Sequence, residues 1–178
     1  TIAQVGFEMY TQLLKEAVRE LKGEEAEEEV EPEINIRVSQ YIPEDYIPDT
    51  RQRLSFYKRF ASITANDEIY TITEELTDRY GEVPALVQNL ISIVELKLML
   101  KRLKARELTQ KGVRLYLAFE DRSGAGPGHD IVARALEIVR KEPKKYRVTP
   151  ESKFIVSMAS EGAALDESRY ILKELLKG

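Results

Sequence analysis

The residue types that usually carry out catalysis are scarce in this chain. His129 is the only histidine and cysteine is absent, so the sequence offers neither a thiolate nucleophile nor the imidazole and thiolate ligands of a zinc site. No G-x-S-x-G motif occurs, and a serine–histidine–aspartate triad would depend on that single histidine. The sequence therefore predicts no catalytic residue, no metal site and no cofactor for this chain.

A glycine-rich stretch comes nearest to a phosphate-binding loop. The letters SGAGPG at 123–128 precede a predicted helix, whose N-terminus is suited to an anion. The dinucleotide fingerprint and the P-loop would both need a glycine where His129 stands, and the P-loop would also need a lysine in place of Asp130. We predict a plain loop at 120–128, and a small nucleotide-using enzyme remains a third, weaker interpretation.

Two groups of basic residues are candidates for binding nucleic-acid phosphates. The first is Arg51, Arg53, Lys58 and Arg59, and the second is Arg140, Lys141, Lys144, Lys145 and Arg147. The aromatic residues among the first group recur at helical spacing, which favours a core role, and the second group follows a predicted helix, whose C-terminal dipole attracts cations.

The overall charge also weakens a nucleic-acid interpretation. The net charge is −4, and the stretch EEAEEEVEPE at 24–33 holds seven glutamates. The rest of the chain carries 27 basic and 24 acidic residues, whereas a dedicated nucleic-acid domain is usually clearly basic. We expect weak direct DNA binding or none.

Three segments follow from the pattern along the chain. Residues 1–23 contain an amphipathic helix at 5–23, residues 24–33 are an acidic linker, and residues 34–178 form one folded domain. Because the first residue is threonine rather than methionine, we expect a piece of a longer protein. The absence of a signal peptide, of a membrane-spanning apolar run and of cysteine predicts a cytoplasmic location without membrane contact.

The folded domain alternates strand and helix signals. EINIRVSQ at 33–40 predicts a half-buried strand, and Pro43 and Pro48 predict an extended connector to a helix capped by Asp49 or Thr50. Leu54, Tyr57 and Ala61 form one apolar stripe of that helix. Further helices are predicted at 66–81, which ends at Gly81, and at 84–104.

The second half predicts two hairpins and two helices. A hairpin at 105–119 turns at Gln110–Gly112, and a hairpin at 146–158 places Pro150 second in its turn. A helix at 129–143 faces inward through Ile131, Ala135, Leu136 and Val139, and a final helix spans 164–177. The fold class is α+β: a mostly antiparallel sheet, made from a single strand plus two hairpins, packed by about six helices.

Four quoted stretches resemble the C-terminal domain of bacterial transcription-repair coupling factors. They are VGFEMY at 5–10, YIPEDYIPDTRQRLSFYKRFAS at 41–62, EELTDRYGEVP at 74–84 and LISIVELKLMLKRLKA at 90–105. The similarity covers about residues 5–177 and is specific between 34 and 105. The loop at 120–130 departs from the family, so no function is carried over to it.

The resemblance implies a non-catalytic regulatory domain within a larger DNA-repair motor. Such a factor moves on double-stranded DNA with ATP and magnesium in upstream motor lobes, from which the helix at 5–23 continues. It displaces RNA polymerase and recruits UvrA for nucleotide excision repair. The C-terminal domain is expected to clamp the factor's own N-terminal UvrB-like module, to mask the UvrA-binding surface and so to be autoinhibitory.

The resemblance also implies a partner-binding site. The family contact to the UvrB-like module maps onto Glu75, Asp78 and Arg79, at the end of the helix written EELTDRYG. Their spacing of three and four places them on one helix face. A solvated Glu75–Arg79 pair is the alternative for these residues, and an accessory DNA-binding module is the alternative for the domain.

Overall fold

The computed structural model of the chain describes residues 31–119 and 127–177, together with five helical residues of the N-terminal stretch, Phe7, Thr11, Leu13, Leu14 and Ala17. Most of the predicted helix at 5–23, most of the acidic linker at 24–33 and most of the loop at 120–128 lie outside the described residues. The predicted segment boundaries at 23 and 33 therefore stay predictions.

The chain divides into two units, one mainly helical and one built on a sheet. The helical unit comprises residues 1–29 and 39–95, and the sheet unit comprises residues 30–38 and 96–178. Helix α4 (Ala85–Arg102) contributes residues to both. Each unit is described separately below.

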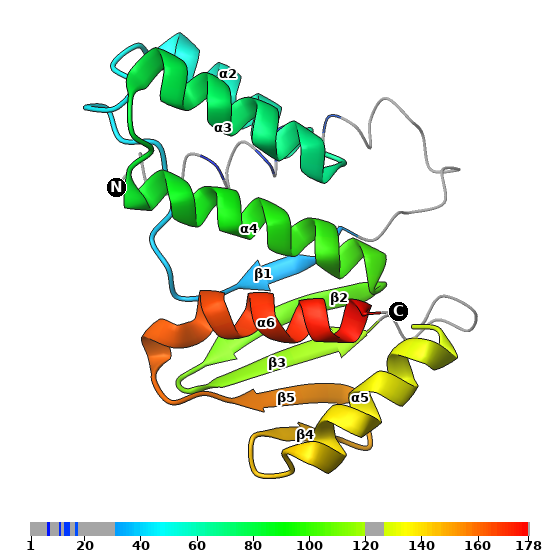
Figure 1. Cartoon of the computed structure of the whole chain (residues 1–178). Coiled ribbons are helices and arrows are strands. Elements are labelled where there is room, and N and C mark those ends of the chain that lie inside the picture. Colours follow the sequence, from blue (N-terminus) through cyan, green and yellow to red (C-terminus); the bar gives the residue numbers. More distant parts are fainter. Residues whose placement is uncertain are drawn as a thin grey trace. The chain divides into compact units, whose positions relative to one another are not determined.

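The helical unit contains α2 (Thr50–Ala61), α3 (Asn66–Tyr80) and the first part of α4 (Figure 1). The Asp49 side chain caps α2 by accepting a hydrogen bond of 2.9 Å from the Gln52 amide, as predicted. The aromatic residues Phe56, Tyr57 and Phe60 are buried, which confirms that they are core. The predicted stripe containing Leu54 is wrong at that residue, since Leu54 is exposed.

The sheet unit contains five strands in the order β1-β2-β3-β5-β4. They are β1 (Glu33–Asn35), β2 (Ala105–Lys111), β3 (Arg114–Phe119), β4 (Tyr146–Val148) and β5 (Lys153–Ser157). Strand β1 is parallel to β2, and the other neighbours are antiparallel. The mostly antiparallel α+β class is thus confirmed.

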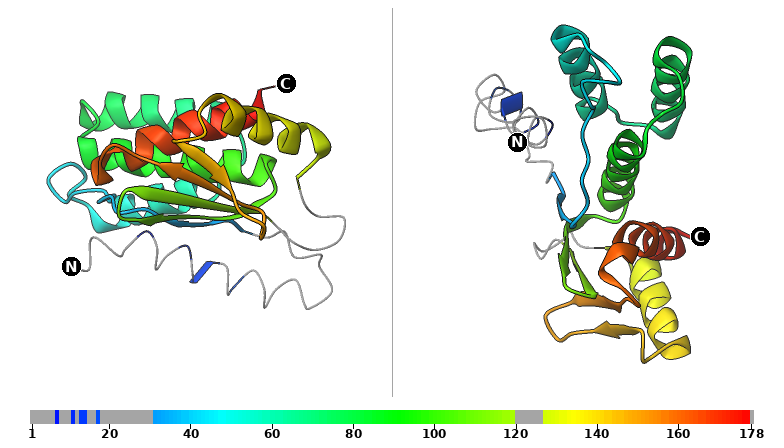
Figure 2. Two further views of the ribbon diagram at one scale, coloured as in Figure 1. Left: turned by 90° about the horizontal axis from the view of Figure 1, so that it is seen from below. Right: turned by 90° about the vertical axis from the view of Figure 1, so that its left-hand side faces the viewer.

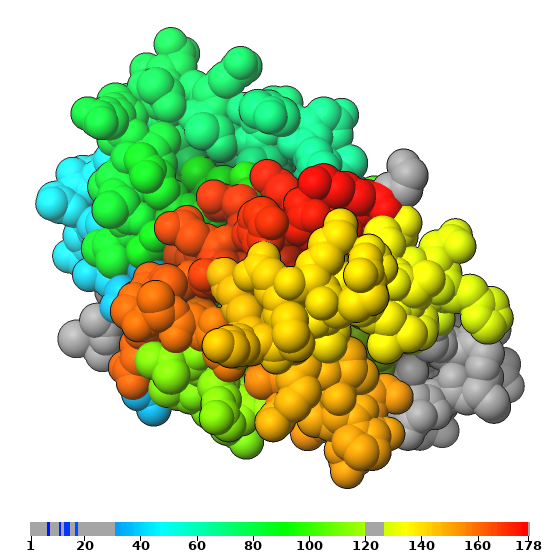
Figure 3. All heavy atoms as spheres, turned by 60° about the horizontal axis from the view of Figure 1, so that its bottom comes forward, coloured from blue at the N-terminus to red at the C-terminus, as the bar shows by residue number. Residues whose placement is uncertain are grey.

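Helices α5 (His129–Lys141) and α6 (Ala164–Leu176) cover one face of this sheet (Figure 2). They lie side by side on the surface drawn in Figure 3. Leu115 and Leu117 of β3 and Phe154 and Val156 of β5 are paired across the strands and fully buried, as alternation along the two strands requires. The five helices α2–α6 of the described part differ slightly from the expected six.

Three sequence predictions need correction in detail. Strand β1 ends at Asn35 rather than continuing to residue 40, because the Arg37 amide donates to the Gln110 side chain instead of to a neighbouring strand. The first hairpin turns at Gly112 and Val113, where Gly112 adopts a φ of +58°, so Gln110 remains inside β2. Leu136 is 56% exposed, and α5 instead buries Ala135 most deeply.

Candidate protein-interaction site on helix α3

Local interactions define both ends of α3. At its start, the Glu68 carboxylate accepts hydrogen bonds from the backbone amides of Thr64 (2.6 Å) and Ala65 (3.2 Å), which satisfies donors that the helix cannot pair. At its end, the Gly81 amide donates to Thr77 O at 3.0 Å, and Gly81 has a φ of +88°, which glycine adopts without strain. Helix α3 therefore has well-defined limits.

A tyrosine from the proline-containing connector holds the C-terminal end of α3. The Tyr46 hydroxyl lies 3.1 Å from Leu76 O and 3.0 Å from Gly81 O, and it can donate to either carbonyl. The Tyr46 ring also contacts the Tyr80 ring, with 5.7 Å between their centroids. Burial raises the pKa of the Tyr46 phenol, and the neighbouring Tyr80 adds to the rise. The phenol therefore stays a protonated donor at neutral pH.

The connector is itself fixed by α2. Arg53 donates from Nη1 to Ile47 O (2.7 Å) and to Pro48 O (3.0 Å), and the Tyr57 hydroxyl accepts from the Ile42 amide (2.8 Å). These bonds satisfy backbone groups that an extended, proline-containing segment cannot pair with a neighbouring strand. The stretch 41–60 thus acts mainly as a framework that positions the end of α3.

Two of the three predicted site residues, Glu75 and Arg79, belong to one ion-paired cluster. The Glu75 carboxylate, whose side chain is 33% exposed, pairs through Oε2 with Arg59 of α2 and through Oε1 with Arg79 Nη1 at 3.2 Å. The hydrogen bond from Arg59 is the main reason that the pKa of Glu75 lies below its ordinary value, and Arg79 lowers it further. The predicted Glu75–Arg79 pair is present, with Arg59 as an additional member.

The arginine side chains of this cluster also contact aromatic rings. The Arg59 Cζ lies 5.1 Å from the centroid of the Phe56 ring, and the Arg79 Cζ lies 5.1 Å from that of Tyr80. Guanidinium groups are attracted to the faces of aromatic rings at such distances. The two guanidinium groups are therefore held between a carboxylate and the rings of a buried Phe56 and a partly buried Tyr80, which restricts their orientations.

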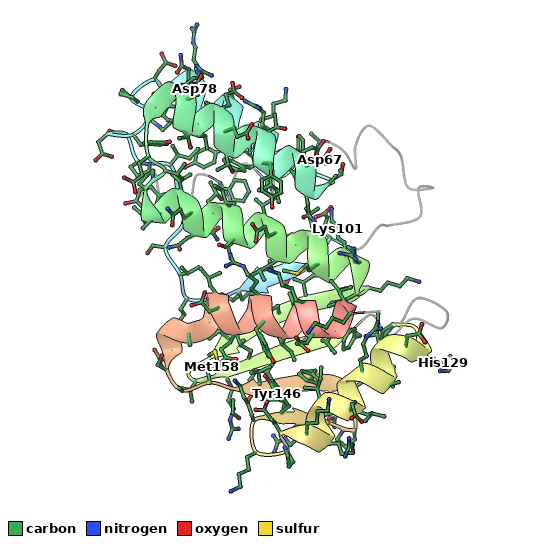
Figure 4. All side chains as sticks on the ribbon, viewed as in Figure 1. Asp67, Asp78, Lys101, His129, Tyr146 and Met158 are labelled. Carbon is green, nitrogen blue, oxygen red and sulfur yellow. The ribbon has the colours of Figure 1, made fainter. Side chains whose placement is uncertain are left out.

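The third predicted residue, Asp78, is in a different situation. Asp78 is exposed, and within the described part of the chain its carboxylate has no hydrogen bond or ion pair. Figure 4 shows it near the end of α3. The site thus combines a restrained arginine with a nearby carboxylate that is available to a partner.

The cluster has the chemistry of a recognition surface. Its groups are carboxylates and guanidinium ions without a nucleophile, and the part of the chain that the structure describes holds no group of three or more residues suited to a metal. Charged groups in fixed positions select a partner of complementary charge. No described helix combines the length and the apolar character that a membrane span requires.

The structure divides the first basic group between framework and surface. Arg53 is occupied with connector carbonyls and Arg59 with Glu75, whereas Arg51 and Lys58 are exposed and have no ionic partner among the described residues. The sequence placed Arg59 only among the basic candidates for phosphate binding. No local pattern reveals its pairing with Glu75, because the two residues lie on different helices.

The second basic group also pairs largely within the domain. Arg140 donates from Nε to the Glu137 carboxylate at 3.0 Å, and Lys141 Nζ lies 3.9 Å from the same group. Lys145 Nζ forms an ion pair of 3.1 Å with Glu167. Lys144 and Arg147 are exposed. Much of the positive charge that the sequence concentrates at 140–147 is therefore neutralised by neighbouring carboxylates.

Comparison with known proteins identifies the family. The family model described as the TRCF domain matches residues 36–128, a little more than half of the chain and a range that includes all of α3. The chain belongs to the TRCF domain family. The resemblance noted from the sequence motifs is thereby confirmed.

Relatives of this TRCF domain are named transcription-repair-coupling factors. The chain is 35% identical to that of Myxococcus xanthus over 179 residues, which is 98% of this chain and 14% of that protein. It is 30% identical to that of Escherichia coli, over 96% of this chain and 15% of that protein. The chain thus spans about one seventh of the length of these relatives.

A solved structure shares the fold. It is the crystal structure of the C-terminal domain of transcription-repair coupling factor, with a TM-score of 0.60 and 20% sequence identity. The alignment covers 83% of this chain and 96% of that one. The likeness at this level of identity concerns the fold alone.

Proposed function

We propose that this TRCF domain is the non-catalytic, autoinhibitory domain of a transcription-repair coupling factor. In this proposal it clamps the factor's own N-terminal UvrB-like module and masks the surface that binds UvrA. ATP, magnesium, double-stranded DNA and RNA polymerase are engaged by other parts of the factor. The names of the relatives and the family match support membership in such a factor.

The observation that carries the proposal is the arrangement at the end of α3. A clamp needs a rigid support and charged groups that are not consumed within their own domain. The Tyr46 hydroxyl supplies the support by bonding to the last turn of α3, and Asp78 supplies an exposed carboxylate without an ionic partner in the described part of the chain. The same surface contains no catalytic group, which agrees with a role in binding alone.

The three site residues have different roles in this proposal. Asp78 contacts a basic side chain of the UvrB-like module directly. Glu75 acts as a positioning residue, since its carboxylate orients Arg59 and Arg79. Arg79 retains further N–H groups beyond the one that faces Glu75, and these meet an acceptor of the partner.

Direct DNA binding receives less support from the same geometry. Within the two basic groups, four side chains already bind acceptors of the domain itself: Arg53, Arg59, Arg140 and Lys145. Affinity for duplex DNA depends on cations that are free to replace counterions along the phosphates. The exposed cations that remain in the two basic groups are Arg51, Lys58, Lys144 and Arg147, so each group keeps fewer free charges than its sequence suggests.

Charge reversal at Asp78 in the full-length factor tests the proposal. Asp78→Arg replaces an attractive contact by a repulsive one, and losing one member of a desolvated pair costs about 2–5 kcal/mol. We expect UvrA to bind at least tenfold more tightly and the basal ATPase to rise. UvrA affinity and ATP turnover are measured for wild type and variant, with circular dichroism as the check on folding.

The matched control is Glu151→Arg, the same reversal at an exposed residue in the turn between β4 and β5. It should leave both readouts at wild-type values. A folded Asp78→Arg variant with wild-type UvrA affinity and ATPase would place the clamp elsewhere on the domain. Glu75→Arg is a weaker test, because a third guanidinium beside Arg59 and Arg79 would also disturb the packing of α2 on α3.

A further inference from the structure

Three exposed apolar side chains of the described residues lie along one rim of the sheet unit. Val132 and Leu136 of α5 are 45% and 56% exposed, and Val148 of β4 is 38% exposed. Val132 and Leu136 are four residues apart, so they share one side of α5. Arg134 lies roughly 160° around the helix from both, and it donates to Leu175 O of α6 at 2.8 Å. Since Figure 3 shows α5 between α6 and the β4–β5 hairpin, the apolar side of α5 faces the β4 edge.

Strand β4 lies at the edge of the sheet and has backbone groups to spare. The Thr149 amide donates to Lys153 O at 2.9 Å, and the Ser157 amide donates to Lys145 O at 2.8 Å. Bonded residues alternate along an antiparallel pair, so Tyr146 and Val148 turn their backbone groups outward. The Tyr146 amide is used by Glu142 O. The Tyr146 carbonyl and both backbone groups of Val148 therefore have no hydrogen bond among the described residues.

Side chains along this edge point alternately to the two faces of the sheet. The Tyr146 ring lies 5.7 Å from that of Phe154, which belongs to the buried face under α5 and α6. Val148 is two residues from Tyr146 and therefore points to the same face. Arg147 lies between them and points to the other face, where it is exposed. The edge is thus apolar on its helix-covered side and basic on its open side.

The basic side of this edge is not neutralised by the domain. Arg147 and the preceding Lys144 are exposed, and neither forms an ion pair in the described part of the chain. The nearest exposed carboxylates along the chain, Glu142 and Glu151, lie beyond the two ends of β4. A segment paired with the three residues of β4 therefore meets a free cation on the open face.

We propose that β4 binds an extended peptide segment as an additional strand, in which acidic residues alternate with apolar ones. The outward amide and carbonyl groups of β4 form the hydrogen bonds of this pairing. The residue opposite Val148 is apolar, because it points to the helix-covered face beside Leu136. Its neighbours in the segment point to the open face, where acidic side chains meet Arg147. The site lies in the sheet unit and does not depend on the clamp proposed for α3.

Binding of synthetic peptides to the whole 178-residue chain tests the site. The labelled probe is Glu-Val-Glu-Val-Glu-Val, and its affinity is measured by fluorescence anisotropy. One control is the block peptide Glu-Glu-Glu-Val-Val-Val, and the other is the alternating peptide Lys-Val-Lys-Val-Lys-Val. The alternating acidic peptide should bind about tenfold more tightly than either control, because it alone presents valines to one face and carboxylates to the other.

Three variants separate the contributions of backbone, apolar contact and charge. Val148→Pro removes the outward amide, and an edge strand tolerates proline there, so binding should weaken about tenfold in a folded chain. Leu136→Ser should weaken it about fivefold. Arg147→Glu should invert the preference, so that the alternating lysine peptide binds more tightly than the acidic one. The matched control is Arg51→Glu at an exposed arginine of α2, and circular dichroism verifies folding.

Several outcomes would overturn the proposal. Equal affinity for the alternating and block acidic peptides would mean that no strand is added to β4. An unchanged peptide preference in folded Arg147→Glu would contradict the assigned chemistry. Tighter binding of a labelled DNA duplex than of the alternating peptide would assign these cations to phosphates. Light scattering should show a monomeric chain, and a dimer that Val148→Pro dissociates would assign the edge to a second copy. Arg147→Glu should leave UvrA binding by the full-length factor unchanged, so failure of the clamp and failure of this site are distinguishable.

Discussion

In the sheet unit the side-chain amide of Gln110 joins three backbone segments, whereas in the helical unit the carboxylate of Glu75 joins two helices. Gln110 is 6% exposed, accepts from the Arg37 amide at 2.9 Å and donates to Gly112 O at 3.0 Å and to Glu161 O at 2.9 Å. The Glu75 side chain is one third exposed and is held by Arg59 and Arg79.

The two clusters differ in burial and in charge, and these differences assign them different tasks. A buried neutral amide with satisfied bonds stabilises one structure, because each of its backbone partners would otherwise lose its hydrogen bond away from water. A half-exposed ionic cluster contributes less to stability, since water competes for every member. Its charges, however, remain accessible to a partner. Of the two clusters, that of Glu75 is thus the better candidate for recognition, and the Gln110 cluster serves the fold.

The largest effect is expected when Gln110 is made apolar. Gln110→Leu keeps the approximate volume but leaves the Arg37 amide and the carbonyls of Gly112 and Glu161 without their partner. The free energy of unfolding should fall by about 3 kcal/mol. Urea titration followed by circular dichroism measures this change. The control is Gln88→Leu at an exposed glutamine. If the two variants lose equal free energy of unfolding, Gln110 has no special role in stabilising the fold.

A smaller loss is expected when the support of α3 is weakened. Tyr46→Phe removes the hydroxyl that bonds to Leu76 O and Gly81 O and keeps the ring against Tyr80. The free energy of unfolding should fall by about 1 kcal/mol. Amide hydrogen exchange in the last turn of α3 should also become faster. Tyr70→Phe, at an exposed hydroxyl, is the matched control and should change neither quantity.

The Glu75 cluster is expected to contribute less still. Glu75→Gln should lower the free energy of unfolding by about 0.5–1 kcal/mol, because the pair with Arg59 links two helices. Glu137→Gln removes a carboxylate that is also held by two cations, Arg140 and Lys141, but on its own helix. We expect no measurable change there. Chemical denaturation measures both variants in parallel. A larger loss for Glu75→Gln than for Glu137→Gln would show that the link between two helices is what makes Glu75 contribute to stability.

The sequence predicted those parts of the fold that depend on local patterns. The caps at Asp49 and Gly81, the spacing of Phe56 and Phe60 and the turn at Pro150 all depend on residues near one another in the chain, and the structure confirms each. The family motifs correctly indicated the TRCF domain. Local sequence patterns and the family motifs were thus sufficient to predict the fold class.

The parts that sequence analysis missed depend on contacts between distant residues. The early end of β1 and the position of the first turn both follow from Gln110, which pairs with Arg37, 73 positions away. The role of Arg59 depends on its meeting Glu75 of another helix. Leu136 has the spacing of a buried residue, but α5 packs against its sheet through a neighbouring face. Helical periodicity predicts that a helix has an apolar face. Which residues of that face point at the sheet depends on how the helix packs.

The smallest predicted effect concerns how stability depends on pH. Of the two clusters compared, only that of Glu75 should contribute a pH-dependent stability. The pKa of Glu75 is lowered in the folded domain from its ordinary value of 4.5, chiefly by the hydrogen bond from Arg59. A carboxylate with a lowered folded-state pKa adds stability that is present above its ordinary pKa and is lost as the pH falls through the folded-state value. The stability difference between wild type and Glu75→Gln should therefore shrink between pH 7 and pH 3.

The difference for Gln110→Leu should stay constant, because an amide does not titrate. Unfolding titrations at several pH values measure both. A Glu75 difference that persists unchanged at pH 3 would mean that its carboxylate gains nothing from Arg59, and the contrast between a charged, pH-sensitive cluster and a neutral structural cluster would fail.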